Sequence, residues 1–330
     1  MHIRLRSFDS CLLALCISLL ASFLLNNKFI FEGASLLVAF FLLTNVVKII
    51  YILCYFIVSF ANPESFLANV MMIYYFLSLE FVLRRVSFDK KIKLKYLLFF
   101  LVAFVLYTIY LDIKSGLYRP VSIFSGPLAL GYFLCAMAII FMGRYKRFGF
   151  LAVILPLLSG SRSTSLLIIP FIDKRMLKKA SFFVPIALGL IFYYFQDVVD
   201  ILIRSITFNA SSDGGRFDSW FYFTDFEWDL HSILFGFGRG HFGSLGHALG
   251  FSDAVVIESS VLVLFASYGF IFGSLWVFVF LLSAVLGKNK IIWLMFFVVS
   301  LFSVFHDSLG VIIFVLISFS YFESSREGGR

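Results

Sequence analysis

Seven side chains that can bind an anion or accept a proton stand out in this largely apolar chain. Four are arginines, two are histidines and one is a glutamate: Arg119, Arg162, Arg216, Arg239, His241, His247 and Glu258. A guanidinium presents a planar fork that suits bidentate contact with phosphate. A histidine has a pKa suited to accepting a proton near neutral pH, and a carboxylate can also serve as a base. The set indicates an anionic substrate and the activation of a hydroxyl group.

The charged residues also have structural interpretations. Arg162 lies in a polar break at residues 159–164, where it either contacts phosphate or extends to the membrane surface. Arg216 and Arg239 either contact phosphate or are solvated loop arginines. Glu258 opens an apolar span, where a carboxylate either acts as the base or caps the helix N-terminus.

The polar region between residues 215 and 273 matches no standard metal or nucleotide motif. His241 and His247 are six residues apart, which is not a zinc spacing, so we expect no metal and consider each a candidate general base. The glycine-rich run 236–240 lacks the Lys-Ser/Thr pair of a P-loop, so we interpret it as a turn and expect no cofactor. Residues 217–229 mix aromatic and acidic side chains, which is typical of a sugar-binding surface or of an aromatic belt at a membrane interface.

The composition places these residues in a membrane protein. The chain has 330 residues, of which 61% are hydrophobic and 14% charged, and soluble domains are far more polar. Backbone in lipid must satisfy its own hydrogen bonds, so continuous apolar runs are helices. The sequence predicts an all-α polytopic integral membrane protein with about 12 (10–12) spans, at roughly 9–25, 30–47, 49–61, 65–83, 94–111, 127–143, 148–159, 163–173, 180–196, 256–286, 291–305 and 309–322.

The basic residues set the topology. Treating 30–61 as two helices hinged at Lys48 puts the basic clusters near 84–95 and 144–147 on the same side as the N-terminus. Both termini are then cytoplasmic, and the net charge of +8 reflects topology and not a nucleic-acid partner. Of 27 lysines and arginines, seven remain on the outer side: Lys28, Lys114, Arg119, Arg162, Arg204, Arg216 and Arg239. The positive-inside rule does not explain these seven outer cations, so we expect at least some of them to have a functional role.

Two irregular regions interrupt the apolar spans. The spans 148–159 and 163–173 are short, so they form a broken-helix hairpin whose apex carries Arg162 at a wet cavity. We expect residues 197–255 to form one large loop on the outer side of the membrane, which the resemblance described below makes periplasmic. We see no second soluble domain and expect residues 1–330 to form a single membrane domain.

Four stretches, taken in order, resemble the O-antigen polymerase (Wzy-type) and O-antigen ligase family. They are Arg119-Pro-Val-Ser-Ile-Phe-Ser-Gly-Pro, Ser159-Gly-Ser-Arg162-Ser-Thr-Ser-Leu, Gly215-Arg216 with Trp220 before Leu234-Phe-Gly-Phe-Gly, and Glu258 before Tyr268-Gly-Phe-Ile-Phe-Gly. The likeness covers residues 119–290.

The resemblance implies a GT-C-like glycosyltransferase of the bacterial inner membrane that needs neither a metal nor a cofactor. It implies a periplasmic substrate, an undecaprenyl-diphosphate-linked glycan whose repeat units are polymerised into O-antigen, capsule or exopolysaccharide. Arg162 and Arg216 would hold the leaving diphosphate. A flippase and a chain-length regulator are implied as partners, beside the lipid bilayer.

Other functions remain open from the sequence. Ligases of this family, which transfer glycan to lipid A-core, usually carry a histidine near the position of Glu258, which favours a polymerase and leaves the base open. A transporter of lipid-linked oligosaccharide would show repeated halves with broken helices. A membrane anchor without chemistry would not need the outer arginines.

Overall fold

The computed structural model forms helices, joined by turns and irregular segments, in the parts of the chain that it describes. These parts are residues 6–83, 95–117, 120–124, 126–144, 154–159, 161–172, 178, 181, 185, 221, 223–242, 257, 259–286, 290–301 and 308–327, and no β-strand forms among them. Within them, two helices are long and apolar enough to cross a membrane, Tyr96–Lys114 and Ser260–Val279. Several other apolar helices are shorter. The fold is therefore all-α and consistent with a helical membrane protein.

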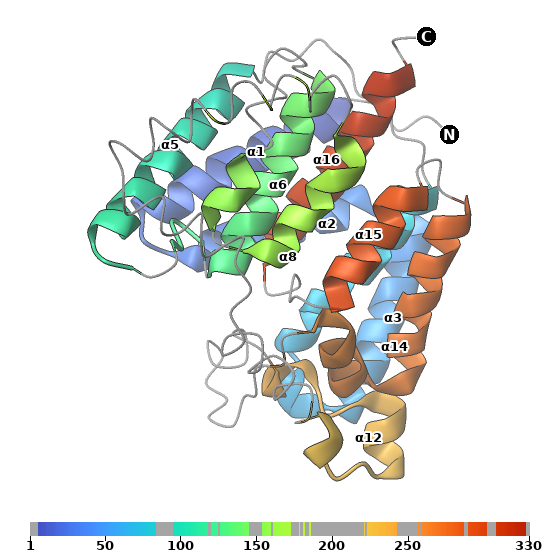
Figure 1. The fold of residues 1–330 in the computed structure, drawn as a ribbon. Helices are drawn as coiled ribbons and strands as arrows, with labels where there is room; N and C mark the ends of the chain where they lie inside the picture. Colours follow the sequence, from blue (N-terminus) through green and yellow to red (C-terminus); the bar gives the residue numbers. More distant parts are fainter. Residues whose placement is uncertain are drawn as a thin grey trace. The chain divides into compact units, whose positions relative to one another are not determined.

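The chain divides into two compact units (Figure 1). Unit 1 comprises Met1–Val38, Arg85–Phe208 and Gly310–Arg330, and unit 2 comprises Ala39–Arg84 and Asn209–Leu309. The expectation that residues 1–330 form a single membrane domain stays a prediction.

Unit 1 is built around two helices that are buried along most of their length, α6 (Pro127–Arg144) and α16 (Leu309–Glu327). Phe133 of α6 and Phe314 of α16 meet edge to face with ring centroids 5.3 Å apart. The unit also contains α1 (Arg6–Leu24), α5 (Lys95–Lys114), most of α2 (Lys28–Leu42), and the short elements η4 (Leu155–Ser159), α8 (Arg162–Ser165) and η5 (Leu166–Phe171). The short elements pack on α6.

The apolar stretch 30–61 forms two helices, α2 and α3 (Asn45–Ala61), as the sequence predicts. The break lies at Leu43–Thr44 and not at Lys48, because Thr44 caps α3 by accepting a hydrogen bond from the Val47 amide. Lys48 stays inside α3 with its ammonium over the Phe40 ring, 5.0 Å from the centroid. A long apolar stem lets a lysine remain in such a helix.

Unit 2 is organised around the 27-residue helix α14 (Ser260–Leu286). Its other elements are α3, η1 (Pro63–Ser65), η2 (Ala68–Met72), α4 (Ile73–Leu83), α12 (Leu230–Phe235), η6 (Arg239–His241) and α15 (Lys290–Leu301). Helices α4, α12 and α15 and the turn η6 all contact α14. α3 and α4 are also tied together, because the Glu80 carboxylate accepts from the Thr44 amide and hydroxyl at 3.3 Å each.

Helix α14 is broken in its middle. Gly269 has φ 70° and ψ −176°, which is not helical, so α14 is two helical segments joined at this residue. The carbonyls of Ala266 and Ser267, just before the break, accept hydrogen bonds from the amides of Phe237 at 2.8 Å and Gly238 at 3.0 Å. The turn after α12 therefore satisfies backbone carbonyls at the point where the helical ladder is interrupted.

Two glycines make this contact possible. A Cβ on Gly269 would overlap the backbone of Leu234 and Phe235, and a Cβ on Gly236 would overlap the backbone of Ser267. Both glycines have positive φ, which other L-residues adopt only with strain. We call this contact between the turn 234–238 and residues 266–269 the glycine crossing.

The glycine crossing predicts that Gly269→Ala is strongly destabilising. The positive φ and the backbone overlap together should cost about 2–5 kcal/mol, measured by thermal unfolding of the purified protein in detergent. Gly33→Ala is the control, because Gly33 is helical and a Cβ there would meet nothing within 4 Å. Equal melting temperatures for the two variants would contradict the crossing.

Candidate functional site

A short polar segment of unit 1, residues 159–165, is here called the serine hairpin. It lies between two short 3-10 helices, at the break that the sequence predicts. Four of its hydroxyl side chains are buried: Ser159, Ser161, Ser163 and Thr164. Irregular backbone among apolar helices is tolerated only where protein or water satisfies it.

The hydroxyls of the serine hairpin satisfy its own backbone. Ser159 donates to the carbonyl of Pro156 at 2.7 Å, and Thr164 and Ser165 both donate to the carbonyl of Ser161, at 3.1 and 2.9 Å. The Ser161 amide in turn donates to the Ser159 hydroxyl at 3.2 Å. These hydroxyls therefore build a fixed loop.

The serine hairpin packs against helix α6. A Cβ on Gly131 would overlap the Thr164 hydroxyl and lie 2.9 Å from that of Ser159, so only glycine allows the approach. One turn further along, the Cys135 thiol donates to the Thr164 carbonyl at 2.8 Å. The hairpin fixes the backbone of Arg162, the first residue of α8, whose side chain lies outside the described part of the structure.

The loop between α5 and α6 is tied to the end of α5. The Asp112 carboxylate accepts hydrogen bonds from the amides of Val121 at 2.8 Å and Ser122 at 2.5 Å. Ser122 has φ 55°, and its hydroxyl bonds to that of Thr108. Arg119 itself lies outside the described residues, two positions before this tied segment.

In unit 2, Arg239 directly follows the glycine crossing and lies in the interior of the unit. The Arg239 side chain is only 1% exposed, and its Nη1 donates to the carbonyl of Phe242. The next amide, that of Gly240, donates to the Ser65 hydroxyl at 3.1 Å, and the Asn62 side chain donates to the carbonyl of Phe235 at 3.2 Å. The interpretation of Arg239 as a solvated loop arginine is therefore wrong.

The remaining candidates divide by whether the structure describes them. His241 lies two residues after Arg239 on η6 and is half-buried. Arg216, His247 and Glu258 lie outside the described residues. The part of the chain that is described contains no group of three or more side chains that could hold a metal. The structure thus places Arg239 and His241 together and leaves the other assignments as predictions.

Three of the aromatic side chains that the structure describes in the loop before α12, those of Phe223, Phe226 and Trp228, pack inward. Phe226 and Trp228 contact Phe237 with ring centroids 5.0 Å apart in each case, and the Trp228 indole donates to the Phe223 carbonyl at 3.1 Å. They cover a small core beneath the glycine crossing. These rings support the turn, whereas Phe221 is 65% exposed.

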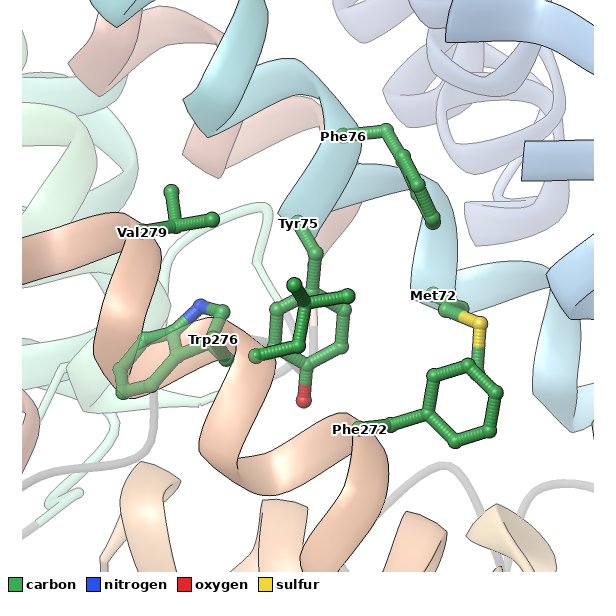
Figure 2. Close-up of a pocket in the computed structure, with 7 residues that line it drawn as sticks. Met72, Tyr75, Phe76, Phe272, Trp276 and Val279 are labelled. Atoms are coloured by element: carbon green, nitrogen blue, oxygen red, sulfur yellow. The ribbon is translucent and has the colours of Figure 1, made fainter. Parts of the chain in front are cut away.

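An apolar pocket lies between α4 and α14 in unit 2 (Figure 2). The Tyr75 ring lies edge to face against two other rings. The ring centroids are 5.9 Å apart for Tyr75 and Trp276 and 6.0 Å apart for Tyr75 and Tyr268. The lining is aromatic and aliphatic: Met72, Tyr75, Phe76, Phe272, Leu275, Trp276 and Val279.

Sequence reasoning missed the glycine crossing and the residues beside it, Ser267 and Tyr268. A signal for it exists, because the apolar run 256–286 is longer than the roughly 20 residues that a span requires and contains a glycine near its middle. The pairing of this glycine with the turn 234–238 has no such signal.

No protein-family model, curated protein or solved structure matches the chain.

The packing of the serine hairpin against α6 predicts that substitutions at Gly131 and Thr164 have non-additive effects on stability. Gly131→Ala should lower the stability by about 1–3 kcal/mol through overpacking, measured by thermal unfolding. Adding Thr164→Ala removes the overlapping hydroxyl, so the double variant should lose less stability than the two single losses added together. Strict additivity would contradict a direct contact.

The N-cap of α12 predicts a pH-dependent local stability. Asp229 accepts from the Ser232 amide at 2.7 Å, while the Ser232 hydroxyl accepts from the Asp229 amide. Hydrogen bonding from Ser232 lowers the pKa of Asp229 below its ordinary value. The stabilisation is therefore complete above the unfolded pKa of about 4 and is lost as the pH falls through the lowered folded value.

Hydrogen exchange of residues 230–236 tests this cap at neutral pH. Asp229→Ala should raise the exchange rate, whereas Asp229→Asn should retain most of the protection, because asparagine also caps well. Asp225→Ala removes an exposed acid of the same loop and is the matched control. Equal exchange in the Asp229→Ala and Asp225→Ala variants would exclude the cap.

Proposed function

We propose that this protein is a membrane glycosyltransferase that polymerises undecaprenyl-diphosphate-linked oligosaccharides on the periplasmic face of the bacterial inner membrane. The observation that carries the proposal is that Arg239 is buried among apolar helices in unit 2. In unit 1 the backbone of Arg162 lies among the buried hydroxyl residues of the serine hairpin. Ionisable residues among apolar spans are costly and mark functional sites. The four motif stretches that resemble the polymerases add the reaction class.

The proposed topology has about twelve spans and both termini in the cytoplasm. The two long apolar helices support membrane insertion, and the distribution of basic residues supports the orientation. The loop at 197–255 is then periplasmic.

The proposed reaction transfers the growing glycan from its lipid carrier. A hydroxyl oxygen of the acceptor repeat unit bonds to the anomeric carbon of the donor, and the bond from that carbon to the diphosphate oxygen breaks. Undecaprenyl diphosphate leaves with the electron pair, and the acceptor proton passes to a base, for which Glu258, His241 and His247 are the candidates. Negative charge grows on the diphosphate as the bond breaks, and Arg162 and Arg216 are the residues proposed to stabilise it.

The pattern of surface glycan in a deletion strain tests this function. Wild type should restore a ladder of repeat units on a gel, while Arg162→Ala and Arg216→Ala should give core with one repeat unit, because the departing charge is no longer offset. Lys290→Ala removes an exposed cation at the start of α15 and should restore the ladder.

Two other outcomes are decisive. Loss of all repeat units from the core, with accumulation on the lipid carrier, would identify a ligase. An unchanged ladder in the deletion strain would reject glycan transfer. Arg162→Lys adds a further comparison, because a bidentate contact should fail with lysine, whereas a charge that extends to the membrane surface should tolerate it.

A further inference from the structure

Two buried hydroxyls lie at the break of α14. Ser267 and Tyr268 are both fully buried. Among the described residues, neither the Ser267 Oγ nor the Tyr268 Oη has a hydrogen-bond partner. A buried hydroxyl without a partner costs free energy, so the protein retains an unfavourable arrangement where its central helix is interrupted. A bound group that accepts hydrogen bonds would remove this cost.

The surroundings of the Tyr268 hydroxyl specify the charge of that group. Arg239 follows Gly238, whose amide donates to the carbonyl of Ser267, the residue before Tyr268, and the turn η6 that carries Arg239 contacts α14. The Arg239 side chain is itself buried. A phenol, a hydroxyl and a guanidinium can all donate hydrogen bonds, and the guanidinium carries a positive charge. In a medium of low dielectric constant a cation favours an anionic acceptor over a neutral one. The arrangement suits a phosphoryl group, whose oxygens accept several hydrogen bonds.

The neighbouring pocket indicates what is attached to the phosphoryl group. The Tyr75 ring contacts the rings of both Tyr268 and Trp276. Tyr75 and Trp276 line the apolar pocket (Figure 2). One aromatic ring thus belongs to the apolar pocket and contacts the phenol ring. A hydrocarbon segment beside a phosphoryl group has this combination of properties, whereas free phosphate uses only the polar part.

We propose that Tyr268 is a substrate-binding residue, whose hydroxyl donates to an anionic phosphoryl oxygen held beside Arg239. The inference rests on the proposed function in that the lipid-linked source of the phosphoryl group is the diphosphate carrier. The hydrogen bond from the Gly238 amide to the Ser267 carbonyl joins the two segments directly before Arg239 and Tyr268, at the break of α14.

Carrier binding to the full-length protein in nanodiscs tests this role. With undecaprenyl diphosphate as the probe, Tyr268→Phe should raise the Kd about tenfold or more, because a hydrogen bond to a charged group is lost. The melting temperature of the unliganded variant should be unchanged or higher, because a hydroxyl without a protein partner has been removed.

Tyr51→Phe is the matched control in the same unit. The Tyr51 hydroxyl donates to the Val70 carbonyl at 3.3 Å, so its loss should lower the melting temperature and leave the Kd unchanged. The two variants thus have opposite signatures. A Tyr268→Phe protein that melts at or above the wild-type temperature and binds the carrier as wild type does would overturn the proposal, as would a wild-type protein that does not bind the carrier.

Two further probes separate the sources of the phosphoryl group. If Tyr268→Phe weakens the binding of inorganic diphosphate as much as that of the carrier, the phosphoryl site stands and takes free anions. If undecaprenol, which lacks phosphate, shows the same tenfold loss, the hydroxyl does not contact phosphate and the proposal fails. An unchanged glycan ladder in the deletion strain, together with weaker carrier binding by Tyr268→Phe, would reject the polymerase and retain the site.

Discussion

The glycine crossing is the contact on which the arrangement of unit 2 depends. A helix broken among apolar neighbours leaves backbone groups that lipid and side-chain carbon cannot satisfy. Here the amides of Phe237 and Gly238 bond to the carbonyls of Ala266 and Ser267, and glycines at 236 and 269 allow the two backbones to meet. Arg239 directly follows this contact and is buried. The burial of the cation is therefore a consequence of how the backbone carbonyls at the break obtain hydrogen bonds.

Unit 1 solves the same physical problem by other means. Its irregular segment, the serine hairpin, uses its own hydroxyls to bond its own carbonyls, and a glycine on α6 makes room for it. In both units a turn is held against a helix at a close approach that a single methyl group would disturb. An arginine belongs to each arrangement: Arg162 lies within the serine hairpin, and Arg239 follows the turn 234–238. Rigid placement of donors is what stabilisation of a developing negative charge requires.

The sequence predicts the features that leave a local trace. The break at 159–164 is marked by consecutive polar residues, and the structure has short helices around it. The sequence predicts the division of 30–61 at Lys48, where a charge interrupts the apolar run. In the structure the division lies before Asn45, because the Thr44 hydroxyl caps the N-terminus of α3. The burial of Arg239 could not be predicted, since it depends on contacts such as that of Gly240 with Ser65, 175 residues away in the chain. A lone glycine in an apolar run is also common in membrane helices, so Gly269 alone does not identify a break.

A density map of the full-length protein in lipid nanodiscs, at a resolution that shows the backbone, tests the central claim most directly. The account predicts two helical segments separated at Gly269, with the turn 236–238 against Ala266 and Ser267 and Arg239 inside unit 2. A continuous helix from Ser260 to Leu286, with Arg239 in solvent, would contradict it. Such a helix would remove the physical reason for a buried cation in this unit and, with it, the phosphoryl site at Tyr268.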